Sequence, residues 1–378
     1  MFNFLSKRKI TILTIIIIFI LLLFNSYQLK NFQIFIFSLS IFSIILFFIK
    51  RINKNLTLII FSLFFSLSLI EASLYFINNK QSVKKSNIIS NQNINIKNKS
   101  TILGFQPLEG IQNHRVFKNN QLVFDKFYTI QSNNYRFTPK INDKKKIRKI
   151  NFFGGSNTFG LGLGDYETLP YLSQKYFLDW EINNYAVSGY GAHQAYTQIK
   201  EFENLIGDIN IFVTFKNHIP RSSCKRDFSL GTPKYILIND KEIIRDGYCG
   251  LISIGKLKIP EIFYKIIKKS QIKIYLDKIY FRKNLFNKKD RDLYLALINQ
   301  MNLNIKNKGN IFIVGYINEY ESLDEKIINY FIEQNIEYVD IGLDNNEENK
   351  IQNDGHPSKI ANIKRSLIIS KKIKNLLN

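Results

Sequence analysis

Three apolar runs within the first 77 residues constrain this chain more than any other feature of its sequence. They cover residues 10–27, 32–49 and 56–77, and each approaches or reaches the ~20 residues that span the hydrocarbon core of a bilayer. The first run follows a basic stretch, as in a signal peptide, but no small-residue cleavage site follows it and two more runs come after it. The sequence therefore predicts a membrane anchor of three transmembrane helices at residues 1–77.

The lysines and arginines around these runs indicate an orientation. Basic residues at 7–9 precede the first run and others at 50–54 precede the third, whereas Lys30 alone lies between the first and second runs. Because basic loops tend to stay in the cytoplasm, we expect a cytoplasmic N-terminus and an extracytoplasmic domain after residue 77. Glu71 falls near the outer end of the third run, where its carboxylate can reach the membrane interface.

The composition excludes several classes of function. The formal charge is +23, but the Lys- and Asn-rich bias extends over the whole chain without an Arg-rich stripe or zinc-finger spacing, so we expect no nucleic-acid partner. Two cysteines are too few for a disulfide-dense scaffold or for multi-cysteine metal sites. Residues 78–100 are rich in Asn, Lys, Ser and Gln and predict a flexible linker.

From residue 101 to 378, short apolar runs alternate with helical patterns. Strands are expected at 150–153, 182–187, 209–215, 310–316 and 337–341, and helices at 167–177, 192–202, 324–334 and 359–377. This alternation predicts an α/β domain with a parallel sheet and helices on both faces. The pattern is interrupted at 222–308, where we expect an insertion with a hairpin near 234–245, suited to a lid or specificity element.

Cys224 and Cys249 both lie in this expected insertion. Disulfides persist outside the cytoplasm, so an extracytoplasmic domain favours a disulfide between them. Two unpaired thiols are the alternative.

Four polar motifs follow expected strand ends or precede the last helix, in the order GGSNTFG, NYAVSG, KNH and DGHPS. Ligands of an open α/β sheet bind beyond the carboxyl ends of its strands. This order of motifs resembles the SGNH (GDSL-type) hydrolase family, which implies a flavodoxin-like α/β fold from about residue 149 to the C-terminus. The stretches NNYRFTP and GLGDYETLP are similar to those of membrane-anchored members.

The resemblance implies a role for individual residues. Ser156 matches the nucleophile, His356 its general base, and Asp354 the group that orients the imidazole. Backbone N–H groups of Ser156 and Gly189 and the side-chain amide of Asn217 would form the oxyanion hole. No metal or organic cofactor is implied.

Other residues near these motifs leave alternatives open. His218 is a candidate for substrate binding or for packing, and Arg221 for holding an anionic substrate group or for a surface position. Asp165 and Glu167 match the carboxylate pair of a glycosidase only in residue type.

Each catalytic motif also has a simpler interpretation. Ser156 could belong to a phosphate-binding loop, although no Walker lysine follows its glycines. The DGHP segment could cap the last helix, and Asn217 could cap a strand end. The chain departs from the family pattern at Gly155, where Asp is usual, and in the single residue between Asp354 and His356, where two are usual.

The leading expectation is a membrane-anchored extracytoplasmic serine esterase that cleaves acyl esters, with acetyl expected, on cell-envelope or exported carbohydrate. The expected substrate is inferred from the resemblance to membrane-anchored members of the family. An O-acyltransferase to a polysaccharide is the first alternative; it would need a separate membrane acyltransferase, because three short helices are too few for an acyl-translocating channel. A catalytically inactive envelope-binding module is the second, suggested by Gly155 and by the short Asp-x-His spacing.

Overall fold

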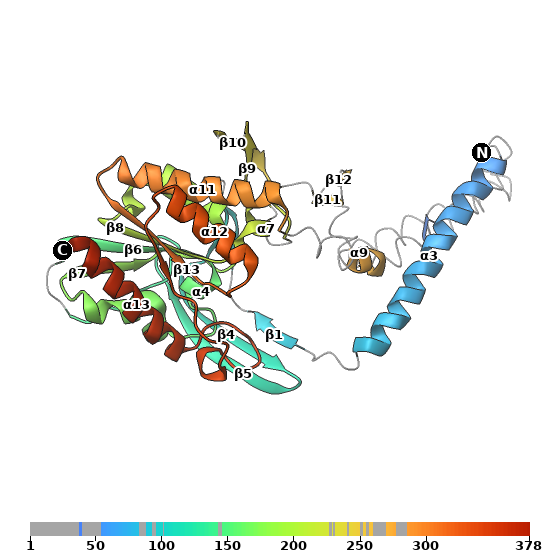
Figure 1. Ribbon diagram of the computed structural model, residues 1–378. Helices are drawn as coiled ribbons and strands as arrows, with labels where there is room; N and C mark the ends of the chain where they lie inside the picture. Colours follow the sequence, from blue (N-terminus) through green and yellow to red (C-terminus); the bar gives the residue numbers. More distant parts are fainter. Residues whose placement is uncertain are drawn as a thin grey trace, which may run out of the picture. The chain divides into compact units, whose positions relative to one another are not determined.

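The computed structural model describes residues 38–39, 54–82, 88–92, 96–100, 102–142, 146–226, 229, 231–239, 242–249, 252–254, 257–259, 270–276 and 286–378. Its contacts divide the chain into two units (Figure 1), which we describe separately. The first, the helical unit, comprises Met1–Ser86 and Leu251–Asn284. The second, the α/β unit, comprises Asn87–Gly250 and Leu285–Asn378.

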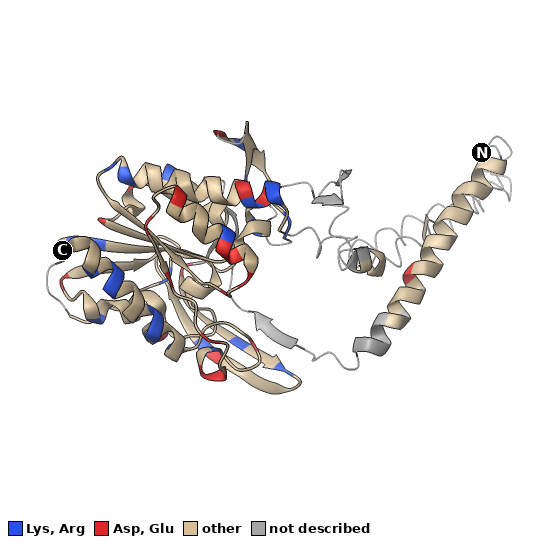
Figure 2. Ribbon diagram, viewed as in Figure 1, with Lys and Arg blue, Asp and Glu red and all other residues tan. Residues whose placement is uncertain are grey.

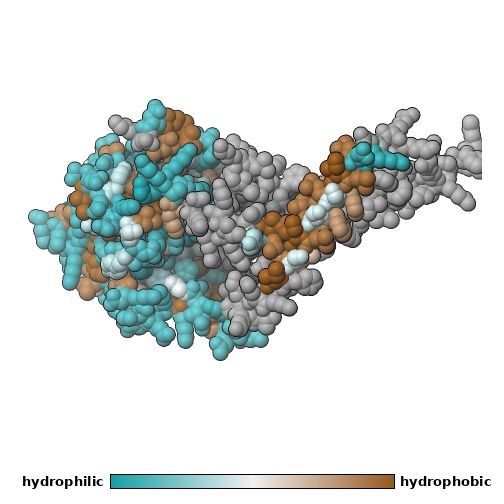
Figure 3. Space-filling model, turned by 45° about the vertical axis from the view of Figure 1, so that its right-hand side comes forward, coloured by the Kyte–Doolittle hydropathy of each residue, from teal (hydrophilic) through white to brown (hydrophobic). Residues whose placement is uncertain are grey.

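Within the described residues, one helix is long and apolar enough to cross a membrane, α3 (Lys54–Ser82). Its candidate span has 22 residues, which rise about 33 Å at 1.5 Å per residue and match the thickness of a hydrocarbon core. Large apolar side chains are exposed along this helix (Figure 3). The third predicted run therefore forms a single helix. The other two, 10–27 and 32–49, lie outside the described residues, apart from residues 38 and 39.

Helix α3 has one acidic residue (Figure 2), Glu71, whose side chain is buried. Its carboxylate accepts hydrogen bonds from the Ser270 hydroxyl (2.9 Å) and from the backbone N–H groups of Gln271 (2.5 Å) and Ile272 (3.0 Å). These N–H groups belong to the start of α9 (Gln271–Leu276), whose first turn has no intrahelical acceptor for them. A carboxylate is a favourable partner there because it also meets the positive end of the helix dipole.

A five-stranded parallel sheet forms the centre of the α/β unit (Figure 1). Its strands are β6 (Arg148–Gly154), β7 (Trp180–Asn184), β8 (Ile209–Thr214), β13 (Ile311–Tyr316) and β14 (Tyr338–Asp340). Every residue of β8 is buried, because a central strand of a parallel sheet is covered on both faces. The predicted α/β class with a parallel sheet is confirmed.

The strand order is β14-β13-β8-β6-β7. Counted along the chain this is 2-1-3-4-5, the flavodoxin-like order of a doubly wound sheet. The direction of winding reverses between β6 and β8, which pair Phe152 with Ile211. Ligands bind such sheets at the carboxyl ends of the strands beside this reversal, where Ser156 and Asn217 follow β6 and β8.

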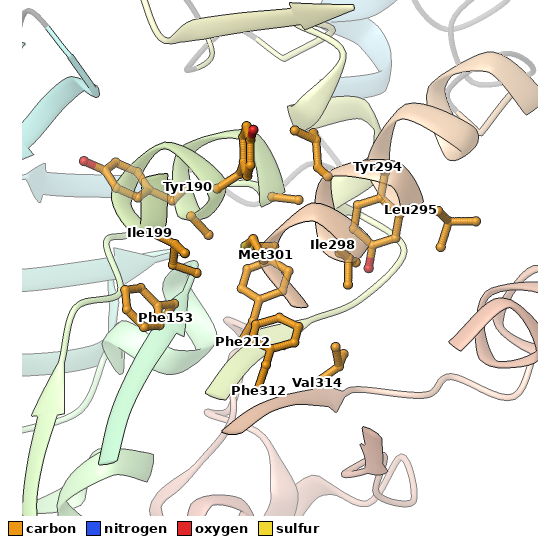
Figure 4. Close-up of a cluster of buried hydrophobic side chains, with 14 of the residues drawn as sticks. Phe153, Tyr190, Ile199, Phe212, Tyr294, Leu295, Ile298, Met301, Phe312 and Val314 are labelled. Atoms are coloured by element: carbon orange, nitrogen blue, oxygen red, sulfur yellow. The ribbon is translucent and has the colours of Figure 1, made fainter. Parts of the chain in front are cut away.

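Helices cover both faces of the sheet. One face carries α6 (Ala192–Glu201), α11 (Lys288–Lys306) and α12 (Ser322–Glu333), and the other carries α5 (Leu169–Ser173) and α13 (Lys359–Leu377). Figure 4 shows the core of the first face, where Phe153, Phe212 and Phe312 of the sheet lie near Ile298 and Met301 of α11. Complete burial of one such side chain stabilises the fold by about 1.5–3 kcal/mol.

This packing corrects the expected insertion at 222–308. Its hairpin is present as β9 (Pro233–Ile238) and β10 (Glu242–Tyr248), which pair antiparallel. However, α11 is a core helix of the α/β unit, because its Tyr294 and Leu297 are fully buried against the sheet. Residues 251–284 instead belong to the helical unit.

The expected linker at 78–100 is also corrected. Helix α3 extends to Ser82, and two strands follow it. The first, β1 (Ile88–Gln92), pairs with β4 (Gly110–Lys118), and β5 (Gln121–Ile130) completes their three-stranded sheet. The second, β2 (Ile96–Ser100), pairs with β3 (Gly104–Pro107) in a separate two-stranded sheet. Main-chain pairing of this kind needs no apolar side chains, so the polar composition did not reveal it.

Candidate active site

Two loops of the α/β unit bring the predicted catalytic residues together. Ser156 begins the short helix α4 (Ser156–Phe159) directly after β6, and Asp354 and His356 lie in the loop before α13. Nε2 of His356 lies 3.0 Å from Oγ of Ser156, and Nδ1 of His356 lies 2.5 Å from Oδ1 of Asp354. A hydroxyl, an imidazole and a carboxylate in this order have the geometry of a nucleophile, its base and an orienting group.

A tight turn allows Asp354 to contact His356 across a single intervening residue. Gly355 has a φ of +94°, a conformation that glycine adopts without a steric penalty. The Gly355 N–H donates to the Ile351 carbonyl (3.1 Å), and the Ile351 N–H donates to the His356 carbonyl (2.7 Å). The short Asp-x-His spacing is therefore compatible with the Asp–His hydrogen bond.

The environment of Asp354 favours its ionised form. Burial alone would raise the pKa of this carboxyl, but the hydrogen bond and the charge of His356 outweigh that effect and lower it below its usual value. The backbone N–H of His356 adds a further hydrogen bond to Oδ1 (3.2 Å). At neutral pH, Asp354 can therefore carry the negative charge that stabilises an imidazolium at His356.

A cleft of about 660 Å³ opens over these residues. Of the other predicted site residues, Asn217 and Arg221 line it together with Ser156. Gly189 and His218 are not among the described residues that line it. Of the predicted oxyanion donors and substrate contacts, Ser156, Asn217 and Arg221 therefore lie at the wall of the cleft.

His218 is a packing residue in this structure. It is 1% exposed, and its Nδ1 lies 2.9 Å from Oγ1 of Thr214, which in turn lies 2.9 Å from the Tyr294 hydroxyl. Burial, and next the charge of Arg221, lower the pKa of His218 well below its usual value, so the imidazole is neutral. The helical geometry of α7 (His218–Ser222) turns this side chain into the core.

The same packing explains Gly155. A Cβ atom at this position would lie 2.8 Å from Nη1 of Arg221, 3.0 Å from Nε2 of His218 and 3.0 Å from the Tyr190 carbonyl. His218 and Arg221 therefore occupy the space that the usual Asp side chain would need. The packing around Gly155 leaves no room for that carboxylate, and the contact between Ser156 and His356 forms without it.

Arg221 borders the cleft from α7. Its Nη1 donates to the Tyr190 carbonyl (3.0 Å), and burial lowers the pKa of its guanidinium to about 10, which leaves it charged at neutral pH. Shortly after α7, Cys224 forms a disulfide with Cys249, with 5.5 Å between their Cα atoms. The disulfide links the chain after α7 to the residue that follows β10.

Arg136 contacts the backbone at the end of α4, the helix that begins at Ser156, and was not among the predicted site residues. Its fully buried guanidinium donates to the carbonyls of Phe159 (2.7 Å), Gly160 (2.7 Å) and Leu163 (2.6 Å), which follow Ser156, and pairs with Asp165 (3.1 Å). The only sequence signal for this role was its place in the NNYRFTP stretch.

Asp165 and Glu167 do not form a facing pair in the cleft. Asp165 contacts Arg136, and Glu167 accepts hydrogen bonds from Lys126 (2.8 Å) and from the Gly164 N–H (2.9 Å). The described part of the chain also holds no group of three or more His, Cys, Asp or Glu side chains placed to bind a metal ion.

No protein-family model matches the chain, and no curated protein matches it. Among solved structures, a member of the G-D-S-L family of lipolytic proteins from Desulfitobacterium hafniense DCB-2 aligns at 13% identity with a TM-score of 0.34, covering 60% of this chain and 99% of its own. LAE5, an alpha/beta hydrolase enzyme from the metagenome of Lake Arreo in Spain, aligns at 11% identity with a TM-score of 0.34, covering 62% and 98%.

Proposed function

We propose that this chain is a membrane-anchored serine esterase of the SGNH (GDSL) type. The observation that carries the proposal is the chain of contacts from Ser156 Oγ through His356 to Asp354, which lies in a cleft at the winding reversal of a flavodoxin-order sheet. An acylated carbohydrate is the proposed substrate, with acetyl as the acyl group. Most side chains that line the cleft are polar, among them Asn157, Asn318 and Asn345, which suits a hydrated sugar better than a long acyl chain.

In the proposed reaction, Oγ of Ser156 attacks the ester carbonyl carbon while Nε2 of His356 takes its proton. The tetrahedral oxyanion accepts hydrogen bonds from the backbone N–H of Ser156 and from the Asn217 amide, each such donor being worth about 10²–10³ in kcat. Collapse expels the alcohol, which takes the proton from His356 and leaves an acyl-serine. Water then attacks this ester by the same route and releases the carboxylic acid and the free serine.

The proposed location is the outer side of a membrane, with α3 as part of the anchor. The exposed apolar surface of α3 supports membrane insertion, and the basic residues before it support a cytoplasmic start. The Cys224–Cys249 disulfide supports an oxidising compartment for the α/β unit.

The test uses the full chain in detergent micelles with a fluorophosphonate probe and 4-methylumbelliferyl acetate. We expect wild type and the control Ser173→Ala to label and to turn over the ester, and Ser156→Ala and His356→Ala to lose roughly 10³-fold or more of kcat. Folded wild type that neither labels nor turns over the ester would contradict the proposal. Adding methyl glucoside and measuring acetylated sugar against free acetate separates hydrolysis from acyl transfer.

A further inference from the structure

The buried stripe of α13 contains one charged residue. Ala361, Arg365, Ile369 and Ile373 follow one another at four-residue spacing along the face that packs on the sheet. The other three are fully buried, and Arg365 is 8% exposed. Several basic residues lie along α13 (Figure 2), and its lysines, by contrast, are exposed or half-buried. An aliphatic side chain at 365 would continue the stripe without the cost of removing a charge from water.

The surroundings of Arg365 offset little of that cost. The buried Arg136 pairs with Asp165 and donates to three carbonyls. Arg365 makes one hydrogen bond to the described residues, from Nε to the Ile341 carbonyl (3.0 Å), and forms no ion pair with them. Burial lowers the pKa of Arg365 to about 10, so the side chain is still a cation at neutral pH.

Arg365 lines the same cleft as Ser156 and His356. It lies six residues into α13, or about 9 Å along the helix from its first residue. The acidic residues Glu319 and Glu321 at the cleft are engaged by Lys216 (2.7 and 2.6 Å), and Asp344 is exposed. The cleft therefore holds a desolvated cation whose two terminal nitrogens are not used by described residues.

We infer that Arg365 binds an anionic group of the substrate, so that the preferred ester is carried by an acidic carbohydrate with a carboxylate. This inference rests on the proposed esterase function and specifies its substrate class. A planar guanidinium with both terminal nitrogens available matches the two oxygens of a carboxylate in a bidentate pair. Such a pair is stronger in a buried site than at the surface, because water screens it less.

The test compares two O-acetylated sugars with the full chain in detergent micelles. Methyl glucosiduronic acid carries a carboxylate at C6, and methyl glucoside carries a hydroxymethyl group there. We expect wild type to prefer the acidic ester in kcat/KM by about tenfold or more. Arg365→Gln should lose this preference, because its kcat/KM should fall further for the acidic ester than for the neutral one. Arg365→Lys keeps the positive charge but lacks the paired terminal nitrogens of a guanidinium, so it should retain part of the preference. Arg148→Gln, at the amino end of β6, is the control and should retain all of it.

A wild type without preference, or an Arg365→Gln variant that keeps it, would overturn the inference. If the neutral ester is turned over in a Ser156-dependent way in either case, the esterase proposal stands and the anion site alone fails. If no ester is turned over, calorimetric titration of the unacetylated sugars tests the site without catalysis. If wild type binds the glucosiduronic acid and Arg365→Gln does not, the result supports an anion site at Arg365. Equal binding by both proteins, or binding by neither, would contradict that site. Melting temperatures of all variants show whether Arg365→Gln is folded, and Arg365→Lys serves if it is not.

Discussion

Nε2 of His356 lies 3.0 Å from Oγ of Ser156, although 200 positions separate the two residues in the chain. The contact forms because β6 delivers Ser156 to the carboxyl edge of the sheet and the loop before α13 returns to the same edge. Its geometry depends on the backbone of that loop and on the packing beneath Ser156, which gives the first two predictions.

Replacing Gly355 by Ala should lower kcat, while lowering thermal stability no more than Gly309→Ala does. Its φ of +94° costs a side-chain-bearing residue about 1–3 kcal/mol, and relief of that strain would move Asp354 away from His356. Gly309→Ala is the matched control, since its φ is +75° and a Cβ there also meets nothing within 4 Å. Steady-state rates on 4-methylumbelliferyl acetate check this. Equal losses of activity in the two variants would contradict it.

Replacing Gly155 by Ala should lower both kcat and the melting temperature. The new Cβ would lie 3.0 Å from both the buried His218 ring and the Tyr190 carbonyl, and neither can move freely. Gly164→Ala is the control, because its nearest neighbour would be 3.5 Å away. Thermal unfolding and ester turnover measure the two effects, and a fully active Gly155→Ala would show that the packing is looser than described.

Arg136→Met should destabilise the protein strongly. Removing the guanidinium leaves Asp165 and three carbonyls without their buried donor, a loss of about 3–5 kcal/mol. Arg115→Met, which removes an exposed ion pair with Asp125, should leave the unfolding midpoint nearly unchanged. Chemical denaturation of both variants provides the measurement. Similar midpoints would mean that Arg136 contributes little to holding the turn after Ser156.

Stability should fall as the pH drops from about 6.5 toward about 3, partly through His193. This residue is fully buried, and burial and then the charge of Arg221 lower its pKa to about 3. Below pH 6.5 the unfolded chain binds a proton at His193 that the folded chain does not bind. The free energy of unfolding therefore falls by about 1.4 kcal/mol per pH unit through this residue. Unfolding measured at pH 7 and pH 5 should show a smaller difference in His193→Gln than in wild type. An unchanged difference would assign the dependence to other groups.

Reduction of the Cys224–Cys249 disulfide should destabilise the α/β unit by about 3 kcal/mol, as expected for a loop of 25 residues. Ester turnover should fall as well, because the disulfide fixes the chain shortly after Arg221, which lines the cleft beside Ser156. Melting curves with and without dithiothreitol provide the test. The chain has two cysteines, so a Cys224→Ser/Cys249→Ser variant should melt at the temperature of the reduced wild type. Dithiothreitol should not change the melting temperature of this variant. A reduced protein that melts as the oxidised one does would contradict the prediction.

The sequence predicted those parts of the fold whose side-chain pattern is set by burial. Strand β8 is mostly apolar and α13 begins after Ser358, so both were located, and Ser156, Asp354 and His356 followed from the motifs near such ends. Helix α11 lies within the range 222–308 that was assigned to the insertion, because its sequence does not indicate which unit it packs against. Arg365 escaped notice because a cation in a Lys-rich helix resembles its exposed neighbours until the packing shows it buried.

The hydrogen bonds between Glu71 and the start of α9 have a consequence for how the α/β unit could be released. Because residues 251–284 belong with α3, the polypeptide passes between the two units after Ser86, after Gly250 and after Asn284. A protease that cut only between α3 and β1 would leave the other two passages intact. The α/β unit would stay attached to residues 251–284, and its release would take more than one cleavage.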